Sequence, residues 1–171
     1  EIAQCLVGSE MCIRDRTGFE VKADELTPYL YPHVKDTVRW AVCGGCRAIF
    51  SSFGMQKTVT QLEILRIILN RTGGKGLIVC PKRVVVEFLT QDEKHLGMKV
   101  TYVRTMQEVK QCPTNIMVTN YERVRDGEDG VRIEPSYFTV TSLDEASVLR
   151  GFGTKTCLLY TSPSPRDTER S

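Results

Sequence analysis

The sequence predicts an α/β domain built on a mostly parallel sheet with helices on both faces. Segments with strand character and segments with helical periodicity alternate along the chain. Residues 76–80 are a continuous apolar run, as expected of a strand buried on both faces of a parallel sheet, and 115–119 are expected to form another buried strand. An alternating order of this kind is typical of a doubly wound α/β domain.

The first part of the domain predicts two helices that flank a short strand. Residues 36–42 are expected to form a helix that ends at Gly44-Gly45, and residues 47–50 form a short apolar run with strand character. Residues 57–70 have helical periodicity, and Thr72-Gly-Gly74 should end that helix. The apolar positions that carry this periodicity are Val59, Leu62, Leu65, Ile68 and Leu69.

The second part of the domain alternates further strands with helices. A proline, Pro81, ends the strand at 76–80. The predicted strands are 76–80, 98–103, 115–119 and 137–143. The predicted helices are 83–95 and 106–110, and a turn is expected at 126–130.

The two ends of the chain are set apart from this domain. Residues 6–16 can be back-translated into DNA whose reverse complement encodes residues 157–166. One DNA element read on its two strands therefore explains both ends, and it resembles a transposase-type sequencing adapter that was translated as gene. We expect adapter-derived or disordered tails at 1–16 and 157–171, an incomplete domain at 17–156, and a true protein that continues beyond both ends.

Composition limits the class of protein. The chain has a formal net charge of +2, which permits a nucleic-acid partner without arguing for one. No apolar run approaches the roughly 18 residues of a membrane span. Cys43-Gly-Gly-Cys46 has no second cysteine pair with which to hold zinc, so a glycine-rich turn with two free thiols is expected. Free thiols and the lack of a signal peptide predict a reducing, cytoplasmic setting.

Residues 51–58, Ser-Ser-Phe-Gly-Met-Gln-Lys-Thr, fit a phosphate-binding loop that opens a helix. Gly54 allows close backbone approach, Lys57 can reach terminal phosphates, and Thr58 can offer its oxygen to Mg²⁺. The usual pattern has glycine directly before the lysine, whereas this chain has Gln56, which adds a Cβ where the loop normally has none. The alternative is a polar turn with a solvated lysine.

Asp144 and Glu145 follow the last predicted strand. An aspartate at a strand end can hold Mg²⁺, and a neighbouring glutamate can orient and deprotonate an attacking water. The alternative is surface charge or a helix N-cap. Ligands of doubly wound sheets bind beyond the carboxyl ends of the strands. The loop at 51–58 and this acidic pair are therefore expected to be two halves of one nucleoside-triphosphate site.

Taken together, these segments resemble the ordered motifs of superfamily 2 helicases. The resemblance is closest to the Swi/Snf-like DNA-dependent ATPases and the related DEAD-like helicases of phages and bacteria. It covers nearly all of 26–156 and corresponds to the first RecA-like P-loop domain only, so a second RecA-like domain is missing from this chain. The segments that carry it are 30–40, 48–58, 77–82, 118–122 and 143–147.

The resemblance implies ATP and Mg²⁺ as cofactors and DNA as a partner. Its catalytic candidates are Glu145, Asp144 and Lys57, and its metal ligands are Thr58 and Asp144. The ATP-binding candidates are Ser52, Phe53, Gly54, Met55, Gln56, Lys57 and Thr58. The nucleic-acid candidates are Pro81, Lys82, Arg83, Thr119 and Asn120.

Besides Gln56, a second position departs from the family pattern. Val34 stands where the family usually has the glutamine that reads adenine, and valine offers neither donor nor acceptor. Adenine specificity would then rest on backbone contacts, stacking or His33, or be lost.

The sequence thus predicts the ATP-binding domain of a DNA helicase or translocase. The isolated chain is expected to bind nucleotide weakly and to have negligible turnover, because the family's arginine finger lies in the second domain. Two alternatives remain open. One is a phosphate-loop NTPase outside the helicases, and the other is a non-catalytic DNA-binding module with a degenerate nucleotide site.

Overall fold

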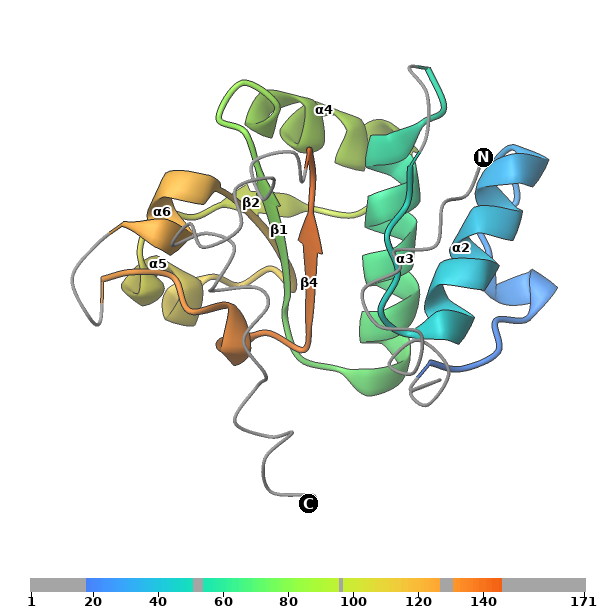
Figure 1. Cartoon of the computed structure of the whole chain (residues 1–171), viewed down its shortest axis with the longest axis horizontal. Helices are drawn as coiled ribbons and strands as arrows, with labels where there is room; N and C mark the ends of the chain where they lie inside the picture. The colour runs from blue at the N-terminus through green and yellow to red at the C-terminus, as the bar shows by residue number, and fades with distance from the viewer. Residues whose placement is uncertain (1–17, 51–53, 96, 127–130, 146–171) are drawn as a thin grey trace. The chain divides into compact units, whose positions relative to one another are not determined.

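The computed structural model describes residues 18–50, 54–95, 97–126 and 131–145. The chain folds as two compact units (Figure 1). Among the described residues, the first unit comprises those up to Thr72 together with Gln91–Met98, and the second comprises Gly73–Thr90 together with those from Lys99 onward. No helix among the described ranges is both long and apolar enough to cross a membrane.

The first unit is built on two helices, α2 (Pro32–Gly44) and α3 (Lys57–Thr72), preceded by the short 3₁₀ helix η1 (Ala23–Glu25). Pro32 stands at the start of α2, where its missing N–H costs no hydrogen bond. Gly45 ends the helix with a φ of 73°, a conformation that favours glycine. The buried core of this unit consists of Val21, Leu26, Leu30, Val34, Val38, Val42, Val59 and Ile67.

A buried carboxylate fastens the segment after η1 to α3. Glu63 has no exposed surface, and its carboxylate accepts hydrogen bonds from the Thr27 backbone N–H at 2.8 Å and hydroxyl at 3.0 Å. Arg66, one turn further along α3, donates to both Glu63 oxygens at 2.8 Å and to the Glu25 carbonyl oxygen at 2.6 Å. Burial opposes the ionisation of Glu63, but the hydrogen bonds from Arg66 and Thr27 outweigh it, so its pKa is lowered.

The second unit contains a four-stranded sheet whose strands are parallel, which agrees with the predicted α/β class. The strands are β1 (Gly76–Cys80), β2 (Val100–Tyr102), β3 (Ile116–Asn120) and β4 (Val140–Leu143). Their spatial order is β2-β3-β1-β4, and every pairing is parallel. β1 therefore lies between β3 and β4, with Val79 opposite Thr119 on one side and Leu143 on the other.

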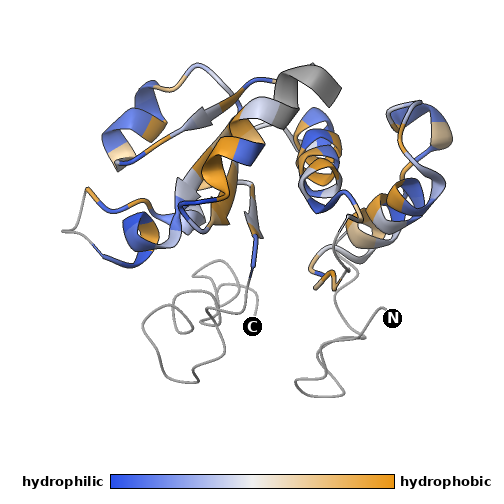
Figure 2. Ribbon diagram, turned by 90° about the horizontal axis from the view of Figure 1, so that it is seen from above, coloured by the Kyte–Doolittle hydropathy of each residue, from blue (hydrophilic) through white to orange (hydrophobic). Residues whose placement is uncertain are grey.

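The central strands β1 and β3 are buried along their whole length, which explains their continuous apolar sequences. Figure 2 shows the hydrophobic residues concentrated in the middle of this sheet. Two short helices, α5 (Met106–Gln111) and α6 (Tyr121–Arg125), contribute to the core that forms against it. The core residues are Leu77, Val79, Val103, Met106, Val109, Met117, Tyr121, Val124, Ile133 and Phe138.

The strand predicted at 47–50 is wrong, because these residues have no ladder partner among the described ranges. A strand exists through its pairing, and this run leaves Phe50 59% exposed. Arg47 is also exposed, and its guanidinium carbon lies 5.5 Å from the centre of the Trp40 ring.

Smaller differences concern the boundaries of other elements. The helix expected from residue 83 is α4 (Val85–His95), since the chain turns between Pro81 and Val84. The last strand begins only at Val140, because η2 (Pro135–Tyr137) is a 3₁₀ turn. Helix α6 follows β3 directly and was not predicted. The turn expected at 126–130 lies outside the described residues except for Asp126.

Candidate functional site

The predicted phosphate loop leads into α3 in the first unit. Of the seven ATP-binding candidates, Ser52 and Phe53 lie outside the described residues. Gly54 has a φ of 80° and open space around its Cα, so a ligand could approach its backbone closely. Lys57 is exposed and is the first residue of α3, while Thr58 is buried beside it. The 16-residue helix α3 presents the positive end of its dipole at these residues.

Gln56 adopts a φ of 52°, which is the left-handed region that favours glycine. Its carbonyl oxygen accepts hydrogen bonds from the backbone N–H and the hydroxyl of Thr60, both at 2.9 Å, and so closes the first turn of α3. The backbone at residue 56 therefore has a conformation that glycine, the residue of the usual motif, adopts without strain. Glutamine at this conformation costs on the order of 1 kcal/mol.

Val34 is part of the core of the first unit and is 1% exposed. It cannot read the edge of a base from that position. The neighbouring His33 is exposed and stacks on Tyr31, with ring centres 5.7 Å apart and planes 13° from parallel. His33 is therefore exposed at the surface, where a base could stack on it, whereas Val34 is not.

Asp144 and Glu145 directly follow β4 in the second unit. The backbone of Asp144 is held on two sides, because its N–H donates to the Val79 carbonyl oxygen at 2.8 Å and its carbonyl oxygen accepts from the Tyr121 hydroxyl at 2.7 Å. Tyr121 lies in the segment 118–122 that carries the resemblance, but it was not named as a site residue. Tyr121 is the first residue of α6 and directly follows β3. Its position after a predicted strand could have marked it in the sequence as a residue near the site.

The structure brings two of the predicted site residues of the second unit into contact. Arg83, a nucleic-acid candidate, donates from Nη2 to both carboxylate oxygens of Glu145, a catalytic candidate, at 3.0 and 2.7 Å. They meet because β1 and β4 are parallel neighbours, so the residues after each strand emerge at the same edge. Glu145 has a φ of 51°, which is unusual for a residue other than glycine.

The remaining nucleic-acid candidates follow β1 or end β3. Lys82 is exposed and Pro81 is half-buried. Thr119 is completely buried, and its hydroxyl donates to the Val103 carbonyl oxygen at 2.8 Å. Asn120 is 5% exposed, accepts from the Tyr102 hydroxyl at 2.8 Å and donates to the Glu122 carboxylate. Thr119 and Asn120 are thus engaged within the fold.

Sequence reasoning overlooked an exposed cation at this edge of the sheet. Arg104 follows β2 and places its guanidinium carbon 5.6 Å from the centre of the Tyr102 ring. Arg104 follows the predicted strand at 98–103 much as Lys82 follows the strand at 76–80. This position could have identified Arg104 as a nucleic-acid candidate.

Acidic side chains act on the thiol at the end of β1. Burial, together with the charges of Asp144, Glu145 and Glu87, raises the pKa of the Cys80 thiol to about 12. Carboxylate and hydroxyl oxygens are ligands that Mg²⁺ prefers. No cluster of three metal-ligating side chains occurs within the described ranges, so a cation here would also need oxygen ligands of other kinds.

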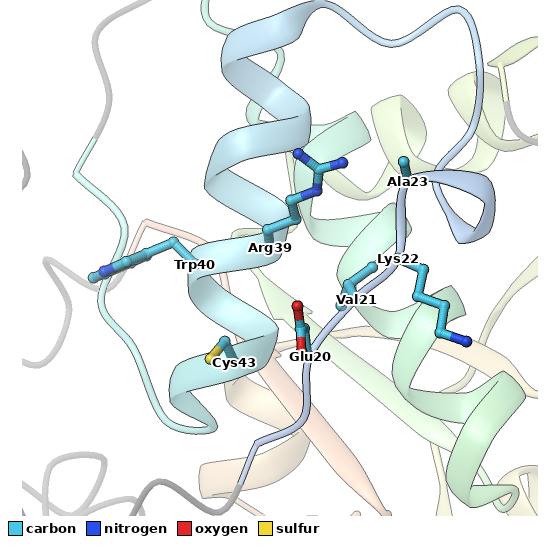
Figure 3. Close-up of a pocket in the computed structure, with 7 residues that line it drawn as sticks. All are labelled: Glu20, Val21, Lys22, Ala23, Arg39, Trp40 and Cys43. Atoms are coloured by element: carbon cyan, nitrogen blue, oxygen red, sulfur yellow. The ribbon is translucent and has the colours of Figure 1, made fainter.

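The first unit has a depression of about 600 Å³. Figure 3 shows the residues that line it. None of the predicted site residues lines it. Its walls come from the segment before α2 and from α2 itself: Glu20, Val21, Lys22, Ala23, Arg39, Trp40 and Cys43.

A comparison with solved structures supports the predicted fold. The chain superposes on the Sulfolobus solfataricus SWI2/SNF2 ATPase core in complex with dsDNA with a TM-score of 0.62 and 15% sequence identity. The match covers 82% of this chain and 31% of that one, so this chain spans about a third of the ATPase core. No family model and no curated protein sequence matches the chain. The match and the parallel sheet confirm the predicted α/β class and agree with a RecA-like domain.

Proposed function

We propose that this chain is part of the ATP-binding domain of a DNA helicase or translocase. The observation that carries the proposal is the backbone at Gly54 and Gln56. Both have positive φ directly before α3, which begins with Lys57 and Thr58. Loops of this kind aim backbone N–H groups at anions, and the helix behind them adds a positive dipole. The likeness to the SWI2/SNF2 ATPase core supports the fold that such a loop needs.

In this proposal each half of the predicted site has its own task. The Lys57 ammonium would neutralise terminal phosphate oxygens and the Thr58 hydroxyl would offer an oxygen to Mg²⁺, while the Asp144 carboxylate could serve as a ligand of Mg²⁺. The Glu145 carboxylate orients water for in-line attack on the γ-phosphate and accepts its proton. Bound Mg²⁺ would neutralise charge that develops on the phosphates. The charges of Asp144 and Glu145 contribute to the raised pKa of the Cys80 thiol, which agrees with carboxylates that could attract a cation.

DNA enters the proposal through the end of β1. Lys82 and Arg83 are exposed at the edge of the sheet where strands of doubly wound folds present their ligand sites. Cations at such positions can contact backbone phosphates without reading sequence. The related structure was solved in complex with dsDNA, which supports duplex DNA as the first partner to test.

A titration with a fluorescent ATP analogue in the presence of Mg²⁺ tests the nucleotide site. Lys57→Ala should weaken binding by about tenfold, since the lysine supplies a charge-assisted contact to phosphate. Lys110→Ala removes an equally exposed cation from α5 and should leave binding unchanged. Equal affinity of the Lys57→Ala variant and the unmodified chain would contradict the proposal.

The second candidate is a non-catalytic DNA-binding module. Two observations favour it over a phosphate-loop NTPase outside the helicases: the Gln56 side chain stands where the usual motif has glycine, and Val34 is buried where the family has a glutamine. DNA binding without any nucleotide binding would support this candidate.

A further inference from the structure

The contact between Arg83 and Glu145 joins two residues to which the proposed function gives separate tasks. One nitrogen of the Arg83 guanidinium lies 3.0 and 2.7 Å from the two Glu145 oxygens. The contact follows from strand order, because β1 and β4 are hydrogen-bonded neighbours with Val79 opposite Leu143. Arg83 follows the first of these strands and Glu145 the second.

This contact engages both oxygens of the carboxylate that the proposed function uses as a base. An oxygen that accepts a hydrogen bond from a guanidinium is less able to accept a proton from water. The positive φ of Glu145 also shows that its backbone is held in a conformation that glutamate rarely adopts. The glutamate is thus positioned by Arg83 in an arrangement unsuited to activating water.

Another anion can replace the Glu145 carboxylate on Arg83. The Arg83 side chain is 75% exposed and the Glu145 side chain 44% exposed, so solvent and solutes reach both partners. An exposed ion pair of this kind shifts an equilibrium by only about two- to fivefold. A guanidinium binds a phosphodiester oxygen as readily as a carboxylate, with the same planar donor geometry.

We propose that Arg83 is a positioning residue that couples DNA binding to the availability of Glu145. A backbone phosphate of DNA displaces the Glu145 carboxylate from Arg83, and the released carboxylate can then turn to the attacking water. The inference rests on the proposed function, because it assumes that Glu145 acts on water and that Arg83 contacts DNA. It goes further because the closed ion pair blocks both tasks, and DNA binding to Arg83 makes Glu145 available for its own.

Competition for Arg83 has a consequence that can be measured without hydrolysis. If DNA must displace Glu145, removal of the carboxylate should tighten DNA binding, and only while Arg83 is present. Removal of any acidic residue also tightens DNA binding slightly through long-range charge. That general effect does not depend on Arg83, so a double-mutant cycle separates the two.

The experiment measures fluorescence anisotropy of a labelled short duplex DNA titrated with the whole chain at low salt. Glu145→Gln should raise affinity about two- to fivefold. In an Arg83→Ala background, Glu145→Gln should raise DNA affinity no more than a control substitution does. The control is Glu87→Gln, which removes an exposed carboxylate whose charge also acts at Cys80. In an Arg83→Lys background, Glu145→Gln should again raise DNA affinity in part, since lysine can still pair with the carboxylate.

Equal effects of Glu145→Gln with and without Arg83 would overturn the coupling and leave the proposed function standing. Absence of DNA binding by every variant, the unmodified chain included, would overturn the DNA part of the proposed function and the coupling with it. A second readout uses the carboxyl ¹³C resonance of Glu145 in the unmodified chain, assigned with the Glu145→Gln variant. It should shift when DNA is added, and no shift with DNA bound would also overturn the coupling.

Discussion

The phenolic hydroxyl of Tyr121 donates to the carbonyl oxygen of Asp144 at 2.7 Å and so fixes the backbone at the end of β4. Tyr121 is 5% exposed and its ring packs in the core of the second unit, so the bond is sheltered from water. The acidic pair is therefore held in place by a residue that begins α6, a helix without a counterpart in the predicted elements.

Tyr121→Phe keeps the ring and removes this hydrogen bond. The expected result is a loss of about 1 kcal/mol in the free energy of unfolding, measured by urea denaturation. Mg²⁺-dependent nucleotide binding should weaken as well, because Asp144 is no longer fixed. Tyr29→Phe is the matched control, since Tyr29 is 63% exposed and should change neither quantity. Equal stability of the two variants would show that the Tyr121 hydroxyl is replaced by water.

Gln56→Gly should stabilise the chain by up to about 1 kcal/mol, because glycine adopts a positive φ without the steric cost that glutamine bears. The greater entropy of glycine in the unfolded chain offsets part of the gain. The variant should also bind the ATP analogue more tightly. Met55→Gly is the control, as Met55 has no positive φ and should lose stability. A less stable Gln56→Gly variant would count against a strained loop.

The Glu63 carboxylate should make the stability of the first unit depend on pH. Its pKa in the folded chain lies below the ordinary value of 4.5 despite burial, because Arg66 and Thr27 donate to it. The ionised form therefore stabilises the fold above that ordinary value, and this contribution is lost as pH falls through the lowered folded pKa. Thermal unfolding from pH 7 to pH 3 should show a steeper loss for the unmodified chain than for Glu63→Gln. Parallel curves would refute the assignment.

Thiol labelling should distinguish the cysteines of the described ranges. Cys43 and Cys46 are exposed, whereas Cys80 is buried with a pKa of about 12 and is a neutral thiol at pH 7. Iodoacetamide should therefore modify Cys43 and Cys46 in the folded chain, and Cys80 only after denaturation. Mass spectrometry of the peptides reads the result. Labelling of Cys80 at the rate of Cys46 would mean that the end of β1 opens readily.

The parts of the fold that were predictable depend on local patterns. The apolar runs at 76–80 and 115–119 became β1 and β3, because a strand buried on both faces has no polar alternation. The periodicity at 57–70 became α3, with an end two residues later. The run at 47–50 also contains consecutive apolar residues, Ala48 to Phe50, but it is unpaired in the described structure. No local pattern reveals whether a partner strand is present.

The sequence was enough to name candidate site residues, but not to predict which contacts they make. Lys57, Thr58, Asp144 and Glu145 were identified from spacing and from their positions after strands or at a helix start. The sequence could not show that Thr119 is buried with its hydroxyl bonded to Val103, since that follows from the pairing of β2 with β3. Nor could it show that Gln56 adopts a left-handed conformation, although its place in the motif suggested that glycine would suit the position better.

The sequence by itself determined the α/β class and most of the helices and strands, and it supplied the candidates for phosphate and metal chemistry, which stay predictions. These depend on the periodicity of apolar residues and on short motifs, which act over a few residues. The tertiary structure alone decided that β1 lies beside β4 and that Arg83 therefore closes on Glu145. Strand order is a long-range property, because it depends on which buried surfaces pack together rather than on any one segment.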